Sequence, residues 1–114
     1  MKLELKERFM IPRLYPRKAS LAVHLTIRAL NEKIKVEAKE KKDVGLKNEG
    51  GNIVWNPKKD KVKDVDFTTL EINFLKDQVT RVDKEQAITP DMVDLCVKIK
   101  DYKVEEEKKV KWEH

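Results

Sequence analysis

The sequence predicts a single α+β domain of about four helices with a small antiparallel β-hairpin or three-stranded sheet, ending in an αα-hairpin. Three observations predict it: two long stretches carry apolar residues at helical intervals, a Gly-Gly pair precedes a β-branched run, and a Thr-Pro-Asp sequence opens a last helix. A length of 114 residues suits one domain. We expect residues 1–101 to form it and residues 102–114 to be a charged C-terminal tail.

The N-terminal segment mixes apolar and charged residues. Residues 3–11 predict a short helix, and the alternation of Leu3 and Leu5 leaves a strand as the alternative. Pro12 and Pro16 end whatever precedes them, because proline lacks an N–H group and restricts the residue before it. We therefore expect an extended segment between the two prolines.

The strongest helix of the first half is expected to follow Ser20, whose hydroxyl suits an N-cap, and a start at Arg17 is the alternative. An apolar seam recurs at helical spacing, and Leu21 and Leu25 broaden the stripe beside it. The seam consists of Val23, Ile27, Leu30 and Ile34. The charged residues 37–43 have helix propensity without an apolar face, so they form either a short second helix or a solvated extension that stops at Gly45.

A hairpin is predicted at Gly50-Gly51, because glycine readily adopts the positive φ angles of a tight turn. The returning strand runs through residues 53–55 and ends near Asn56, since Pro57 cannot donate to a sheet. A third short strand is expected to pair with this strand. Its apolar residues are Val62, Val65 and Phe67.

The last two helices are predicted at roughly 69–86 and 90–101. The first has a threonine cap at Thr68 or Thr69, Glu71 in its first turn and an apolar seam widened by Leu70 and Phe74. Its seam consists of Ile72, Leu75, Val79 and Val82. The second begins at Thr89-Pro90-Asp91, with a capping hydroxyl and proline at the first helical position. Its buried face consists of Met92, Leu95, Cys96 and Ile99.

The composition excludes several classes of protein. Charged residues make up 41% of the chain, and no run approaches the roughly 18 apolar residues that span a bilayer. The alternating start lacks the apolar centre of a signal peptide, so we expect a cytoplasmic protein without membrane contact. The single cysteine, Cys96, excludes an intramolecular disulfide and is expected to pack in the core.

No pattern in the sequence indicates catalysis, a cofactor or a metal. The two histidines, His24 and His114, lie far apart, and His24 is expected to be a packed, hydrogen-bonded residue of its helix. Ser20 lies four residues from His24, but a capping serine explains it better than a nucleophile does. We therefore expect a non-catalytic protein with no cofactor and no metal.

The net charge of +5 is unevenly distributed along the chain. Residues 1–42 carry 12 Lys and Arg against 5 Glu, a net charge of +7, whereas residues 43–101 carry 10 against 12, a net charge of −2. One interpretation is a nucleic-acid surface in which Phe9 and Tyr15 stack on bases between basic side chains. Those side chains are Arg8, Arg13, Arg17, Lys18 and Arg28. A solvated face or a patch for an acidic protein explains the same residues.

Protein binding is the leading hypothesis, with nucleic-acid binding by the N-terminal third as the alternative. Aromatic side chains such as Trp55, Trp112 and Tyr15 are typical of interface hot spots, although Trp55 is also expected to lie under the hairpin as a core residue. Trp112 has no evident core to enter. The candidate binding residues are Arg13, Tyr15, Arg17, Lys18, Arg28 and Trp112.

The turn and strand Gly-Gly-x-Ile-x-Trp-Asn at residues 50–56, with the helices on either side, resembles small uncharacterised proteins encoded by bacteriophages and prophages. The resemblance covers roughly residues 3–101, and the prolines at 12 and 16 depart from it. It supplies no catalytic residues. It implies a phage accessory protein that acts on a host protein, or a small component of the virion.

Overall fold

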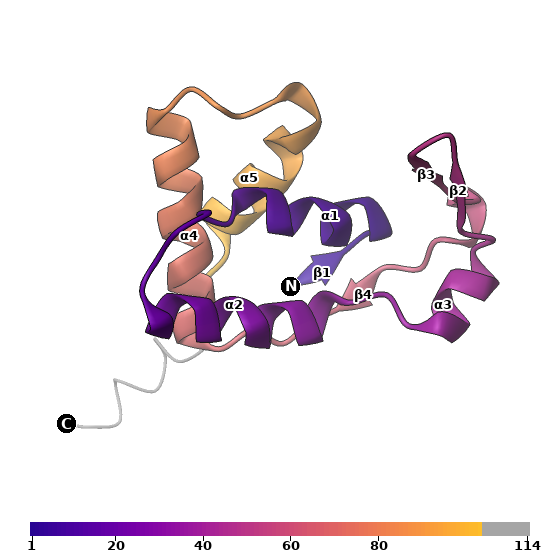
Figure 1. Cartoon of the computed structure of the whole chain (residues 1–114), viewed down its shortest axis with the longest axis horizontal. Helices are drawn as coiled ribbons and strands as arrows, with labels where there is room; N and C mark the ends of the chain where they lie inside the picture. Colours follow the sequence, from indigo (N-terminus) through magenta and orange to yellow (C-terminus); the bar gives the residue numbers. More distant parts are fainter. Residues whose placement is uncertain (104–114) are drawn as a thin grey trace.

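The chain folds around its own N-terminal segment. A computed structural model describes residues 1–103, and in it strand β1 (Lys2–Leu3) and helix α1 (Leu5–Met10) lie between the longer helices (Figure 1). A 3₁₀ helix, η1 (Ile11–Leu14), continues directly from α1. The apolar side chains of this segment are buried, except for the half-buried Phe9. The expected helix therefore begins at Leu5 rather than Leu3, which pairs as a strand instead.

The segment between Pro12 and Pro16 is not extended as expected. Pro12 lies in the first turn of η1, where its missing N–H is no loss, and the 3₁₀ helix continues to Leu14. The backbone becomes extended only at Tyr15. The turn points Leu14 into the core, and the Leu14 carbonyl accepts a hydrogen bond of 2.9 Å from the Arg81 side chain.

Helix α2 (Leu21–Ile34) is the predicted long helix, and the Ser20 hydroxyl caps it by accepting a 3.2 Å hydrogen bond from the Val23 amide. Leu30 and Ile34 are buried, and Val23 and Ile27 pack against the core from its edge. The second half of the helix is therefore covered more deeply than the first. In the first half only one side of the helix is covered, and the leucines expected to broaden its buried stripe are exposed.

Helix α3 (Ala38–Asp43) is a separate short helix, followed by a hairpin of β2 (Lys47–Glu49) and β3 (Asn52–Val54). The hairpin turn has the predicted glycines at φ +57° and +88°, and Asn48 pairs with Ile53. All six strand residues are exposed. Trp55, half-buried beyond β3, lies with its ring centroid 5.6 Å from that of Phe9 rather than under the hairpin.

The predicted third strand pairs elsewhere. Strand β4 (Lys63–Asp64) pairs antiparallel with β1, with Leu3 opposite Lys63, so residues 1–103 hold two sheets of two strands and not one of three. Pro57 explains the difference, because it cannot extend the hairpin ladder and instead begins the 3₁₀ helix η2 (Pro57–Lys59). The chain then turns back to the N-terminal segment.

The predicted αα-hairpin is present as α4 (Thr69–Lys84) and α5 (Val93–Asp101), which are joined through the short 3₁₀ helix η3 (Pro90–Met92). Thr68 and Glu71 form a capping box, with hydrogen bonds of 3.1 and 2.8 Å. Every residue of both predicted seams is buried. Thr89 does not cap its helix as expected, because its hydroxyl bonds the Asp91 carboxylate instead.

The buried side chains of these elements form one cluster, which Tyr102 joins from its edge. The predicted tail of residues 102–114 therefore begins with a residue that packs on the domain, and its remainder lies outside the described residues. No helix in residues 1–103 is long and apolar enough to cross a membrane.

Two leucines of α4 offer a direct comparison of buried and exposed positions. Leu75 is fully buried, so Leu75→Ala should lower the free energy of unfolding by about 2–5 kcal/mol. Leu70 is 68% exposed, so Leu70→Ala should change it by less than about 0.5 kcal/mol. Urea denaturation of both variants measures the difference, and equal losses would show that the buried face of α4 is misassigned.

Candidate binding surfaces

The first half of α2 presents an apolar surface to solvent. Leu21 is 76% exposed and Leu25 is 49% exposed. The two residues are four apart, so they lie on one side of the helix, and Arg28, also exposed, continues the same stripe three residues later. This arrangement places two leucines and a cation on an outer face that no other described element covers.

A shallow groove of about 320 Å³ lies beside that stripe, between α2 and α4. Ala22, Val23 and Thr26 form its α2 wall, and Leu70 and Phe74 belong to the opposite wall. Because Ala22 is three residues before Leu25, it connects the groove to the exposed stripe. We call the groove together with Leu21, Leu25 and Leu70 the α2–α4 face.

A buried carboxylate holds the two helices of the α2–α4 face together. Glu71 is 5% exposed and, besides capping α4, it binds the Lys33 ammonium of α2 at 2.6 Å. The same ammonium donates a 2.9 Å hydrogen bond to the Asp66 carbonyl just before α4. These bonds fix the start of α4 against α2, and thus the width of the groove.

The structure does not assemble the predicted basic residues into one patch. Arg13 pairs with Asp91 of η3 at 3.3 Å. Arg17, Lys18 and Arg28 are exposed, and none of the three forms a salt bridge within residues 1–103. These three cations remain candidates for a partner, whereas Arg13 already has an acidic neighbour.

Tyr15 is directed inward and is no stacking platform. Its hydroxyl donates a 3.1 Å hydrogen bond to Asn31 of α2, and its ring lies 6.2 Å from that of Phe74 between centroids. Burial, with a smaller contribution from the Glu71 carboxylate, raises the pKa of Tyr15 well above its ordinary value. The other proposed platform, Phe9, packs on Trp55.

Arg8, expected on the basic surface, is 2% exposed and serves the fold. Its guanidinium donates hydrogen bonds to the Ile34 carbonyl at 3.0 Å, to the Lys35 carbonyl at 2.5 Å and to both carboxylate oxygens of Glu40. One side chain thus joins α1 to the end of α2 and to α3. The sequence alone does not predict this pairing, because nothing in it distinguishes Arg8 from the basic residues that are exposed.

The structure decides two further predictions, for Cys96 and His24, but not the one for Trp112. Cys96 is buried as expected, and burial, with a smaller contribution from Asp83, raises the pKa of its thiol. His24 is exposed on the outer side of α2, so its prediction as a packed residue is wrong, because in this half of the helix only the side with Val23 and Ile27 packs against the core. Trp112 lies outside the described residues.

The described side chains form no cluster of three or more His, Cys, Asp or Glu that could hold a metal ion. Comparison with known proteins adds no relative. No protein-family model matches the chain, and neither a curated protein nor a solved structure matches it. Its function must therefore be inferred from its own surfaces.

The Arg8–Glu40 pair predicts how stability depends on pH. The Arg8 hydrogen bonds lower the pKa of the Glu40 carboxyl, so the ionised form stabilises the fold. This contribution is complete above the ordinary glutamate pKa of about 4.3 and is lost as the pH falls through the lowered pKa. At pH 7, Glu40→Gln should lower the free energy of unfolding by about 1–3 kcal/mol. This loss is smaller than for a fully buried pair, because the Glu40 side chain is 30% exposed.

The measurement is urea denaturation of wild type and Glu40→Gln between pH 7 and pH 3. The difference in stability should shrink as the pH falls. Glu37→Gln is the matched control, because Glu37 precedes the same helix but is exposed and faces only Lys35, at 3.7 Å. A constant difference for Glu40→Gln down to pH 3 would show that its carboxylate charge does not stabilise the fold.

Proposed function

We propose that the chain is a non-catalytic module that binds another protein through the α2–α4 face. The observation that carries the proposal is the exposure of three leucines, Leu21, Leu25 and Leu70, at the beginnings of two neighbouring helices. Single exposed leucines are common on protein surfaces. Three leucines beside one groove are typical of an interaction site.

The energetics favour a macromolecular partner. Burying each of these leucines in a complex yields about 1.5–3 kcal/mol, and the groove that Leu70 lines admits a side chain from the partner. Asn73 and Asp77 give the groove a polar edge, which is the usual arrangement around an apolar interface centre. The face is too open to enclose a small substrate.

The charges near α2 indicate the chemistry of the partner. Arg28 belongs to the leucine stripe, and Arg17 and Lys18 precede the helix, so a complementary surface carries carboxylates around apolar side chains. The resemblance of residues 50–56 to phage proteins supports a host protein or a virion component as that partner. Nucleic-acid binding by the N-terminal third is the weaker candidate, because Arg8 and Tyr15 are directed inward and Arg13 faces Asp91.

The proposal predicts that Leu25→Ser combined with Leu70→Ser abolishes capture of partner proteins without unfolding the chain. Both side chains are exposed, so the loss of stability should stay below about 1 kcal/mol. Quantitative affinity capture from bacterial lysate, with wild type and variant compared protein by protein, provides the measurement.

The control is Val93→Ser with Val97→Ser, which removes an exposed apolar pair from α5. Proteins captured by wild type and by this control, but not by the α2–α4 variant, would support the proposal. Identical capture by all three would overturn it. A wild-type dimer in sedimentation equilibrium that the α2–α4 variant dissociates would also overturn it, by assigning the face to self-association.

A further inference from the structure

Helix α3 lies at the opposite end of the molecule from α4 (Figure 1). A second hollow lies beside α3. It is a cavity of about 380 Å³ between α3 and the chain segment that leads from η2 into β4. Volumes of this size are typical of sites for small ligands or for one group of a larger ligand. None of its residues belongs to the α2–α4 face.

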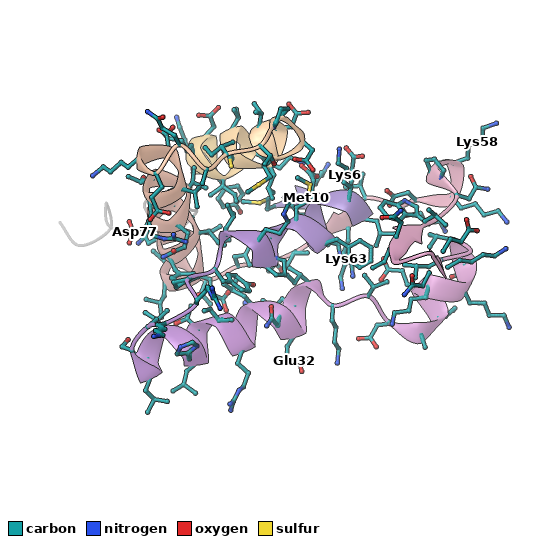
Figure 2. The ribbon with its side chains drawn as sticks, turned by 45° about the horizontal axis from the view of Figure 1, so that its top comes forward. Lys6, Met10, Glu32, Lys58, Lys63 and Asp77 are labelled. Atoms are coloured by element: carbon teal, nitrogen blue, oxygen red, sulfur yellow. The ribbon has the colours of Figure 1, made fainter. Side chains whose placement is uncertain are left out.

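Four lysines surround this cavity. Lys39 comes from α3, and Lys59, Lys61 and Lys63 come from the opposite wall, where they alternate along the chain. All four are exposed, and none forms a salt bridge with a carboxylate of residues 1–103. Figure 2 shows Lys58 projecting at this end of the molecule and Lys63 nearer its middle.

Two of the three carboxylates at the cavity have cationic partners outside it. Glu40 is bound by the buried Arg8, although Lys63 also helps to lower the pKa of its carboxyl, and Glu37 faces Lys35. The four lysines and three carboxylates that line the cavity leave it a net charge of +1, to which Arg8 and Lys35 add from its edge. A concave surface with this charge concentrates anions.

The cavity also has an apolar part. Val44 is buried beneath it, and Val62, between two of the lysines, is 57% exposed. A bare inorganic ion would leave the exposed Val62 uncovered. An anionic group attached to an organic body matches both the charged rim and the apolar surface.

Both walls are fixed to the rest of the fold. Arg8 holds α3 through Glu40, and the Asp60 carboxylate accepts hydrogen bonds of 3.3 Å from the Leu5 amide. The Val44 carbonyl accepts a 2.8 Å hydrogen bond from the Asn56 amide, and β4 pairs with β1. The backbones that carry the lysines are therefore held in place without a ligand, which lowers the entropic cost of binding.

We propose that this cavity binds an organic phosphate, with the phosphate oxygens among Lys39, Lys59, Lys61 and Lys63 and the organic body on Val44 and Val62. Phosphate is favoured over a carboxylate because it carries up to two charges and lysine binds it as a point charge. A nucleotide and a single-stranded nucleic acid both supply this group. The proposal is independent of protein binding at the α2–α4 face.

The test is a binding titration of the full chain with three probes at low salt: inorganic phosphate, thymidine monophosphate and a labelled twelve-residue oligothymidylate. We expect one of the organic phosphates to bind and inorganic phosphate to bind at least tenfold more weakly. If thymidine monophosphate binds with an affinity comparable to that of the oligonucleotide, the cavity is a nucleotide site. Binding of the oligonucleotide alone identifies a nucleic-acid site, with a log–log salt slope of about −2 to −3 for three or four neutralised phosphates.

The deciding variant is Lys59→Glu with Lys61→Glu, which should weaken binding at least tenfold. Lys41→Glu with Lys42→Glu is the matched control, because these lysines also belong to the α3 end, are exposed and change the net charge equally, but do not line the cavity. Equal weakening by both variants would show diffuse attraction and overturn the site. Absence of binding by every probe would overturn it as well.

A measurement on wild type keeps the test independent of variant folding. Acetylation of the lysines, followed by mass spectrometry, should show that the bound probe protects Lys59 and Lys61 and leaves Lys41 and Lys42 reactive. Equal protection of all four would contradict the proposal.

Discussion

The hydrogen bonds of Arg8 are the interaction on which the arrangement of the molecule depends. The guanidinium lies almost entirely out of solvent and satisfies two main-chain carbonyls at the end of α2 as well as the Glu40 carboxylate. A buried cation without partners is very costly, so α1, α2 and α3 have little freedom to separate while Arg8 remains inside. The α3 end of the molecule has few buried apolar residues of its own, since every strand residue of the hairpin is exposed. Its position therefore depends on this one charged side chain more than on packing.

Local patterns in the sequence predicted most of the helices, because caps and periodic apolar residues act within a few positions of one another. Ser20, Thr68 and the glycines of the hairpin turn all have the predicted conformations. Pairing over long distances was not predictable in this way. The partner of β4 is decided by how η2 redirects the chain after Pro57, and the exposure of Leu21 and Leu70 is decided by which side of each helix the fold leaves uncovered. Neither is encoded in the residues nearby.

The candidate sites also depend on long-range arrangement that local patterns in the sequence do not predict. A count of charges located an excess in the N-terminal third, but folding removes Arg8 from that surface and pairs Arg13 with Asp91. The lysines around the α3 cavity lie in two segments, one of them in the part of the chain whose net charge is negative. They form a cationic site because the fold directs the nearby carboxylates toward Arg8, Lys35 and the Leu5 amide. The net charge of a stretch of sequence therefore gives little information about whether a particular surface of the folded protein is positively or negatively charged.

The pairing of β1 with β4 affects the order in which the protein folds during synthesis. Lys2 and its partner Asp64 are 62 positions apart, so the ribosome needs about 3–12 s to produce the second strand after the first. During that interval the apolar side chains of residues 1–14 lack the neighbours that cover them in the finished fold. Charged residues are interleaved with these apolar side chains and keep the segment soluble during this interval. Two of them, Arg8 and Glu7, later bind Glu40 and Lys98. The same charges that hold the native centre together thus also serve as its solubilising groups before the rest of the chain arrives.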